Sequence, residues 1–123
     1  MKLSQEQGTG THRIRNYQPG EVTINEDTYA SSLVVMPETL MLDWVPETLE
    51  ELTVEHLTAI LELEPEVILL GTGTQQRFPE RALIKEVIMR GVGLEIMDTA
   101  AACRTYNVLM AEDRRVAAAL LLR

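Results

Sequence analysis

The sequence predicts an α/β fold with a mixed sheet, in which a C-terminal β-α-β-α-β parallel core is extended by N-terminal meander strands. Residues 66–71 (EVILLG) form a near-continuous apolar run, which is typical of a strand covered on both faces. Beyond this run, strand-like and helix-like segments alternate, which favours parallel strands joined by right-handed crossovers. No repeat or linker interrupts residues 11–123, which we expect to form one domain.

The N-terminal part consists of extended segments separated by turns. Residues 1–10 are polar and contain glycine, and we expect them to form a disordered arm. The Pro-Gly pair at 19–20 predicts a hairpin over residues 11–24, because proline presets φ at about −65° and glycine accepts positive φ. Within the hairpin, strict alternation places Ile14 and Tyr17 on opposite faces.

Two more strands and a helix are expected before the apolar run. Residues 31–37 and 39–45 are strand-like, and alternation in the second places Leu42 on the same face as Trp44. The helix is expected over residues 46–63.

The start of this helix has two possible signals. Thr48 and Glu51 fit a capping box, in which a hydroxyl and a carboxylate bind the free amides of the first turn. Thr53 offers a second start. Pro65 ends the helix, since it cannot continue one.

The C-terminal half alternates between strand and helix. Residues 79–91 are expected to be helical, with Pro79 at the first position, and residues 93–98 form the next strand. A second helix begins at Thr99 with Asp98 as its N-cap, and residues 116–122 return as a strand. The buried stripe of the first helix is expected to be Leu83, Ile84, Val87 and Ile88.

The charge distribution argues against nucleic acid as a partner. The net charge is −8, and residues 1–66 hold 13 acids against 3 bases. No Lys or Arg lies between Glu38 and Glu66, whereas phosphate backbones attract clusters of these residues. The acidic stretch is either a solvated face or a docking face for a basic partner.

Several features favour a soluble cytoplasmic protein. No apolar run reaches the ~20 residues of a membrane span. The N-terminus lacks the apolar region of a secretory signal. The single cysteine, Cys103, suits a reducing compartment because it has no partner for an internal disulfide.

The glycines after residue 70 raise the question of a phosphate-binding loop. A dinucleotide fingerprint needs a third glycine three residues after Gly73, where Gln76 stands. A P-loop needs Gly-Lys-Ser/Thr, and this stretch has no lysine. The pattern therefore does not predict nucleotide binding.

The same loop still predicts a ligand cleft, provided that the strands beginning at Val67 and Gly93 are parallel neighbours. Pockets of parallel sheets form beyond the carboxyl ends of the strands, and helix N-termini favour anions. The alternative is that the glycines only permit a tight turn and the threonines act as caps. The candidate ligand-binding residues are Gly71, Thr72, Gly73, Thr74, Gln75, Arg77, Asp98, Thr99 and Asn107.

No catalytic or metal-binding constellation is evident. His12 and His56 are the only histidines, and their spacing from Cys103 matches no metal-ligand pattern. Cys103 lies in an alanine-rich helical stretch, where a small buried thiol is the ordinary interpretation. We expect no catalytic residues, metal or cofactor.

Two motifs carry a resemblance to a known family. They are the pattern G-T-G-x-x-Q-x-x-P at residues 71–79 and the stretch DTAAACRTYNVL at residues 98–109, followed by E-x-R-x-V-A-A-A-L at 112–120. With these motifs the chain resembles the Mth938-like family of domains of unknown function, which includes mitochondrial complex I assembly factor 3. The resemblance implies a three-layer α/β sandwich and supports a strand at residues 116–122. The absence of an evident mitochondrial targeting segment indicates a bacterial member.

Two functional hypotheses follow. The first is a non-enzymatic protein-interaction or assembly factor, related to respiratory complex I assembly factors, that binds an unknown protein partner as a monomer or weak homodimer. The second is a binder of a small anionic ligand, with or without enzymatic activity, in the cleft at the carboxyl ends of the parallel strands.

Overall fold

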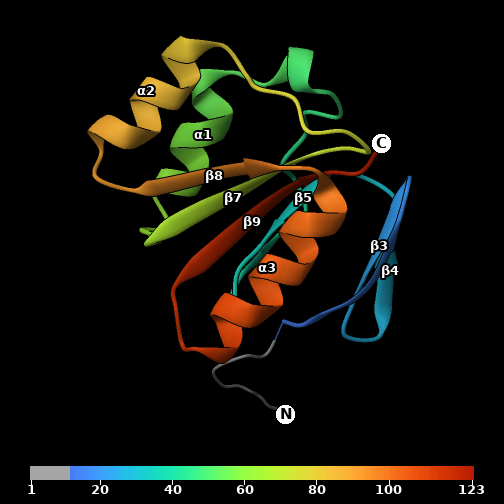
Figure 1. Ribbon diagram of the computed structural model, residues 1–123. Coiled ribbons are helices and arrows are strands. Elements are labelled where there is room, and N and C mark those ends of the chain that lie inside the picture. Colours follow the sequence, from blue (N-terminus) through green and yellow to red (C-terminus); the bar gives the residue numbers. More distant parts are fainter. Residues whose placement is uncertain (1–11) are drawn as a thin grey trace.

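A computed structural model describes residues 12–123 (Figure 1). The expected disordered arm at residues 1–10 lies outside these residues. A five-stranded mixed sheet forms the centre of the fold. In spatial order its strands are β6 (Leu40–Met41), β5 (Leu33–Val35), β9 (Val116–Leu121), β7 (Val67–Thr72) and β8 (Gly93–Met97).

The C-terminal half is the predicted parallel core. Strand β7 lies between β8 and β9 and pairs in parallel with both, so that Val67 is opposite Gly93 on one side and Val116 on the other. Helix α2 (Arg81–Met89) connects β7 to β8, and helix α3 (Thr99–Ala111) connects β8 to β9. The expectation that the strands beginning at Val67 and Gly93 are parallel neighbours is therefore confirmed.

The helices cover both faces of the sheet, which gives the predicted three-layer sandwich. Helices α1 (Val54–Leu61) and α2 lie on one face, and α3 lies on the other (Figure 1). Side chains alternate along β7, so that Leu69 packs in the core beneath α3 and Ile68 packs in the core beneath α1 and α2. All six residues of β9 are buried, as expected for a strand covered on both faces.

The predicted N-terminal meander forms a separate three-stranded sheet beside α3. Its strands are β2 (Ile14–Gln18), β3 (Glu21–Ile24) and β4 (Asp27–Tyr29). The strict alternation expected for the hairpin is wrong, because the register of β2 shifts between Ile14 and Asn16. A β-bulge inserts one extra residue, and it lets both Ile14 and Tyr17 pack against the core that contains α3.

The segment before α1 differs from the prediction. Strand β6 contains only Leu40 and Met41, and Leu42 is exposed whereas Trp44 is buried. A 3-10 helix, η1 (Leu49–Glu51), follows, and α1 begins after Thr53 rather than at the earlier signal. The backbone N–H of Thr53 donates to Nδ1 of His56, so the second predicted start is the one used.

Helix α2 is shorter than predicted. It begins at Arg81, with Glu80 as N-cap, so Pro79 precedes the helix instead of occupying its first position. Leu83 and Val87 are buried as expected, but Ile88 is exposed because α2 covers the edge of the sheet and leaves its outer face open.

Candidate functional site

The strands β7, β8 and β9 all end at one edge of the sheet, which we call the carboxyl edge. Strands β7 and β8 end there in Thr72 and Met97, and β9 ends there in Leu121. The last two residues of β7 and the loop that follows them, residues 71–77, are together called the glycine loop below. It lies beside the start of α3 and the C-terminus of the chain (Figure 1).

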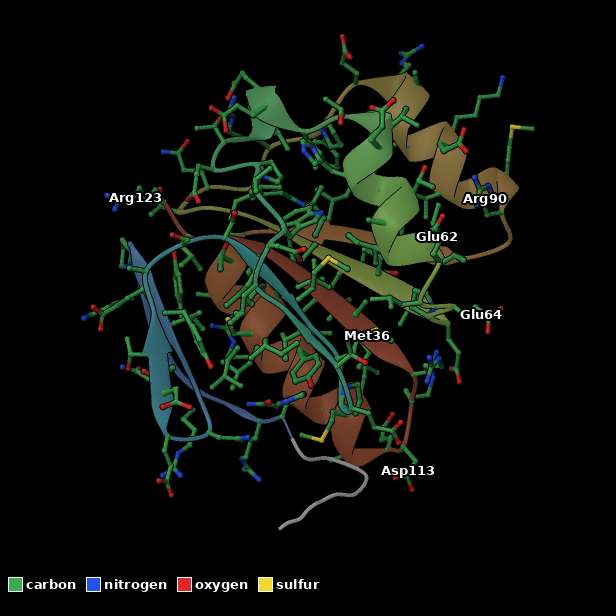
Figure 2. The ribbon with its side chains drawn as sticks, turned by 180° about the vertical axis from the view of Figure 1, so that it is seen from behind. Met36, Glu62, Glu64, Arg90, Asp113 and Arg123 are labelled. Atoms are coloured by element: carbon green, nitrogen blue, oxygen red, sulfur yellow. The ribbon has the colours of Figure 1, made fainter. Side chains whose placement is uncertain are left out.

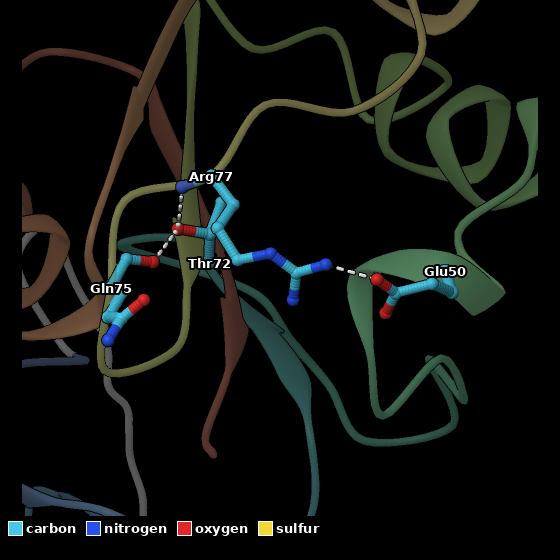
Figure 3. Close-up of polar contacts among 4 residues, drawn as sticks. All are labelled: Glu50, Thr72, Gln75 and Arg77. Carbon is cyan, nitrogen blue, oxygen red and sulfur yellow. Dashed lines mark hydrogen bonds and ion pairs between the residues drawn. The ribbon is translucent and has the colours of Figure 1, made fainter.

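The Thr72 hydroxyl organises the glycine loop from within. It donates to the carbonyl oxygen of Gln75 at 2.6 Å and accepts from the backbone N–H of Arg77 at 3.1 Å (Figure 3). Its oxygen also lies 3.2 Å from the carbonyl oxygen of Met97, at the end of β8. The side chain is buried, so these bonds close the loop on itself instead of presenting the hydroxyl to a ligand.

The Thr99 hydroxyl makes a second internal junction. It accepts from the backbone N–H of Gly73 at 2.8 Å and donates to the carbonyl oxygen of Leu121 at 2.5 Å. The backbone N–H of Thr99 in turn donates to the carbonyl oxygen of Gly73 at 2.9 Å. The loop, the first turn of α3 and the end of β9 are therefore joined through one fully buried threonine.

The two glycines are required by close packing. A Cβ on Gly71 would lie 2.9 Å from Oγ1 and 3.0 Å from Cα of Thr99. Gly73 has φ of +97°, which favours glycine, and a Cβ there would overlap the carbonyl oxygen of Arg123. Both positions thus have a structural reason to be glycine that involves no phosphate.

Asp98 occupies the place that an anion would take at the start of α3. Its carboxylate accepts from the backbone N–H of Ala101 at 2.8 Å, which confirms the predicted N-cap. The N–H groups of Thr99 and Ala101 are already bonded, which leaves few donors for an anion at this position. The negative charge of Asp98 would also repel an anion there.

The remaining loop residues face outward. Thr74 and Gln75 are exposed. The guanidinium of Arg77 forms an ion pair with Glu50 in η1, and this hydrogen-bonded guanidinium lowers the pKa of the Glu50 carboxyl (Figure 3). A hollow of about 360 Å³ is bordered by Gly73, Thr74 and Asp98, together with the β2–β3 turn.

Asn107 lies apart from the other predicted site residues. Its side-chain amide accepts from the backbone N–H of Ile14 at 3.1 Å and donates to the carbonyl oxygen of Ile14 at 2.7 Å. It therefore attaches β2 to α3, whereas Gly71, Thr72, Gly73 and Thr99 meet at the carboxyl edge.

Cys103 and the histidines do not form a nucleophile pair among residues 12–123. Burial raises the pKa of the Cys103 thiol to about 12, so the thiol stays protonated at neutral pH. Nδ1 of His12 lies 2.9 Å from the carbonyl oxygen of Met36, and His56 caps α1. Within this part of the chain there is also no group of three or more metal-ligating side chains, and no helix long and apolar enough to cross a bilayer.

The sequence reasoning missed a group of exposed apolar side chains at the carboxyl edge. Strand β6 runs parallel to β9, because both are antiparallel to β5, and so β6 also ends at this edge. The segments that leave the sheet here carry four large apolar side chains that are exposed: Leu42, Val45, Val54 and Phe78. Alternation had placed Leu42 on the same face as Trp44, which is buried, so the exposure of Leu42 was not expected.

Comparisons with known proteins agree on one family. Residues 14–121 match the family model described as a protein of unknown function (DUF498/DUF598). A Danio rerio protein named NADH dehydrogenase (ubiquinone) 1 alpha subcomplex assembly factor 3 is 32% identical over 123 residues, which cover 98% of this chain and 70% of that protein.

Two solved structures are also similar. A Xanthomonas campestris protein has a TM-score of 0.86 and 42% identity, covering 99% of this chain and 92% of its own. A Bordetella pertussis protein described as a Mth938-like domain has a TM-score of 0.81 and 30% identity, with coverage of 99% and 92%.

Proposed function

This chain belongs to the DUF498/DUF598 family of proteins of unknown function, and from that premise we propose that it is a non-enzymatic interaction domain that acts as an assembly factor for protein complexes. The family includes complex I assembly factors, which supports this kind of role. We also place the protein in the cytoplasm, because its single cysteine is a buried thiol of the kind found in reducing compartments.

The observation that carries the proposal is that four exposed large apolar side chains lie on segments that leave the sheet at the carboxyl edge. We call Leu42, Val45, Val54 and Phe78 the edge patch. Val45 is 66% exposed and Phe78 is 65% exposed, and the ion pair between Glu50 and Arg77 holds the glycine loop beside η1. Large apolar side chains gathered on one surface and rimmed by charges are typical of a protein-binding site.

The charge around the edge patch indicates the chemistry of the partner. Asp43, Glu50, Glu51 and Glu55 are exposed on the same connecting segments. No Lys or Arg occurs between residues 38 and 66 to balance these acids. Arg77, from the glycine loop, pairs with one of them, Glu50. We infer a partner that presents apolar side chains surrounded by lysine or arginine, because such a surface complements both the patch and its rim.

The internal bonding of the glycine loop favours this proposal over an anion-binding cleft at the same edge. A ligand there would need free donors, but the hydroxyls of Thr72 and Thr99 bind backbone groups and the charge of Asp98 would repel an anion. We propose that Gly71, Thr72, Gly73 and Thr99 brace the edge on which the patch is displayed.

A site-specific crosslinking experiment tests the proposal. A photoreactive amino acid replaces Phe78 in the full chain, and the matched control replaces Met89, which is 74% exposed on α2. We expect crosslinking in native lysate to yield a protein adduct at Phe78 and none at Met89. The captured partner is then purified and its affinity for the unmodified chain is measured.

Charge reversal completes the test with the purified partner. The double variant Glu50→Lys/Glu51→Lys is expected to weaken binding at least about tenfold, which corresponds to about 1.4 kcal/mol. The control Glu62→Lys/Glu64→Lys carries the same charge change beyond the far end of α1 (Figure 2) and is expected to bind normally. Equal crosslinking at Phe78 and Met89, or equal effects of the two double variants, would contradict the proposal.

A further inference from the structure

A second polar region lies between β2 and α3, away from the carboxyl edge. The bulge in β2 and the bonds from Asn107 to Ile14 leave a cavity of about 230 Å³ between the strand and the helix. We call it the β2–α3 cleft. The residues that line it include Arg15, Asn16, Tyr17, Cys103, Arg104 and Asn107.

Positive charge gathers at this cleft. Arg15 and Arg104 line it, and a neighbouring hollow of about 540 Å³ shares Arg15 and adds Arg13. Within residues 12–123, no carboxylate lies within 4 Å of any of these three guanidinium groups. The chain has 19 acids and 11 Lys or Arg residues, so acids are plentiful, yet none of the acids in the described part of the chain forms an ion pair with this group.

Other arginines in the same protein have internal partners. Arg90 pairs with Glu86 and Arg114 pairs with Glu66, at 3.2 and 2.7 Å. The guanidinium of Arg115 donates to the carbonyl oxygens of Glu64 and Leu63. The arginines of the cleft, by contrast, form no ion pair with any described residue, and Arg15 and Arg104 line the same concave site.

The other groups in the cleft do not compete for these donors. The Cys103 thiol at its floor is buried, and its raised pKa of about 12 keeps it neutral. The Tyr17 hydroxyl donates to the carbonyl oxygen of Leu122 at 2.9 Å. Both polar atoms of the Asn107 amide bind Ile14. The guanidinium groups and the exposed side chain of Asn16 are therefore the donors that a ligand would meet.

We propose that the β2–α3 cleft is a binding site for a small oxyanion, a carboxylate or phosphate group held by the guanidinium groups of Arg15 and Arg104 with Arg13 at the rim. The planar fork of a guanidinium matches the two oxygens of either group. A cavity of about 230 Å³ is smaller than typical drug-sized pockets of roughly 300–1,000 Å³. It therefore suits inorganic phosphate or a short dicarboxylate. This inference does not depend on the edge patch or its partner.

An NMR titration of the full 123-residue chain tests the site. Amide spectra are recorded with increasing inorganic phosphate, with increasing succinate, and with sodium chloride at matched ionic strength. We expect saturable shifts at Arg15, Asn16, Cys103 and Arg104 with phosphate or succinate and none of these with chloride. The anion that saturates at the lower concentration identifies the preferred group.

Matched arginine variants locate the binding. Arg15→Gln and Arg104→Gln are each expected to raise the apparent Kd about tenfold or more. Arg81→Gln removes the same charge from the exposed start of α2 and is expected to leave the Kd unchanged. The dispersion of each spectrum shows that the variant is folded. Shifts that follow ionic strength alone, saturation at Gly73 and Thr74 instead, or an equal effect of Arg81→Gln would overturn the proposal.

Discussion

The glycine loop and the β2–α3 cleft both gather polar side chains beside α3, but the fold uses those side chains differently. In the loop, the hydroxyls of Thr72 and Thr99 are buried and bonded to backbone groups. In the cleft, the guanidinium groups of Arg15 and Arg104 are exposed and, among residues 12–123, have no acidic partner within 4 Å.

This difference separates polar residues that maintain the fold from those that are available to a ligand. A buried polar atom must be bonded, because an unpaired one costs about 1–3 kcal/mol. An exposed arginine is solvated, so it costs little without a partner and contributes little to stability. We therefore expect substitutions in the loop to reduce stability and substitutions in the cleft to leave stability nearly unchanged.

The largest effect is expected from Gly73→Ala. The substitution forces a side chain into φ of +97° and against the carbonyl oxygen of Arg123, so we expect a loss of about 3 kcal/mol or more in the free energy of unfolding. Gly91→Ala is the control, since Gly91 has φ of +79° but no atom within 4 Å of the added Cβ, and it should cost about 1 kcal/mol. Urea denaturation measures both, and equal losses would show that the contact with the C-terminus is unimportant.

A smaller loss is expected from Thr99→Val. Valine keeps the shape of threonine but removes the oxygen that binds Gly73 and Leu121, which leaves a buried N–H and a buried carbonyl without their partner. We expect a loss of about 2 kcal/mol. Thr74→Val, in the exposed part of the same loop, should change stability by less than about 0.5 kcal/mol. If Thr99→Val is as mild as its control, the buried junction does not brace the loop.

Much of the parallel core could be predicted from the sequence because its signals are local. The apolar run at residues 66–71 gave a buried strand, and Asp98 marked the start of α3 as its cap. The sequence of β9 was compatible with either a helix or a strand, since the alanines at 117–119 have a high intrinsic helix propensity. Burial between two layers of helices decides in favour of a strand, in which three small residues pack closely.

The polar regions were harder to predict, because the role of each polar residue depends on contacts with residues that are distant in the sequence. The glycine loop resembles a ligand site locally, but the reason for Gly73 is the carbonyl oxygen of Arg123, 50 residues later. The cleft has no motif at all: Arg15 and Arg104 line one cavity because the fold places β2 beside α3. A sequence pattern can predict the turn, but it does not show which polar atoms form hydrogen bonds with the rest of the chain.

The smallest effect is expected in the cleft, and it completes the contrast with the loop. Arg15→Gln and Arg104→Gln should each change the free energy of unfolding by less than about 0.5 kcal/mol, because both side chains are exposed and neither guanidinium forms an ion pair within residues 12–123. Arg115→Gln is the matched control, since its guanidinium donates to two backbone carbonyls, and we expect a loss of about 1 kcal/mol. Urea denaturation measures all three. A loss at Arg15 or Arg104 that equals the loss at Arg115 would mean that these arginines support the fold, and the contrast between the two regions would fail.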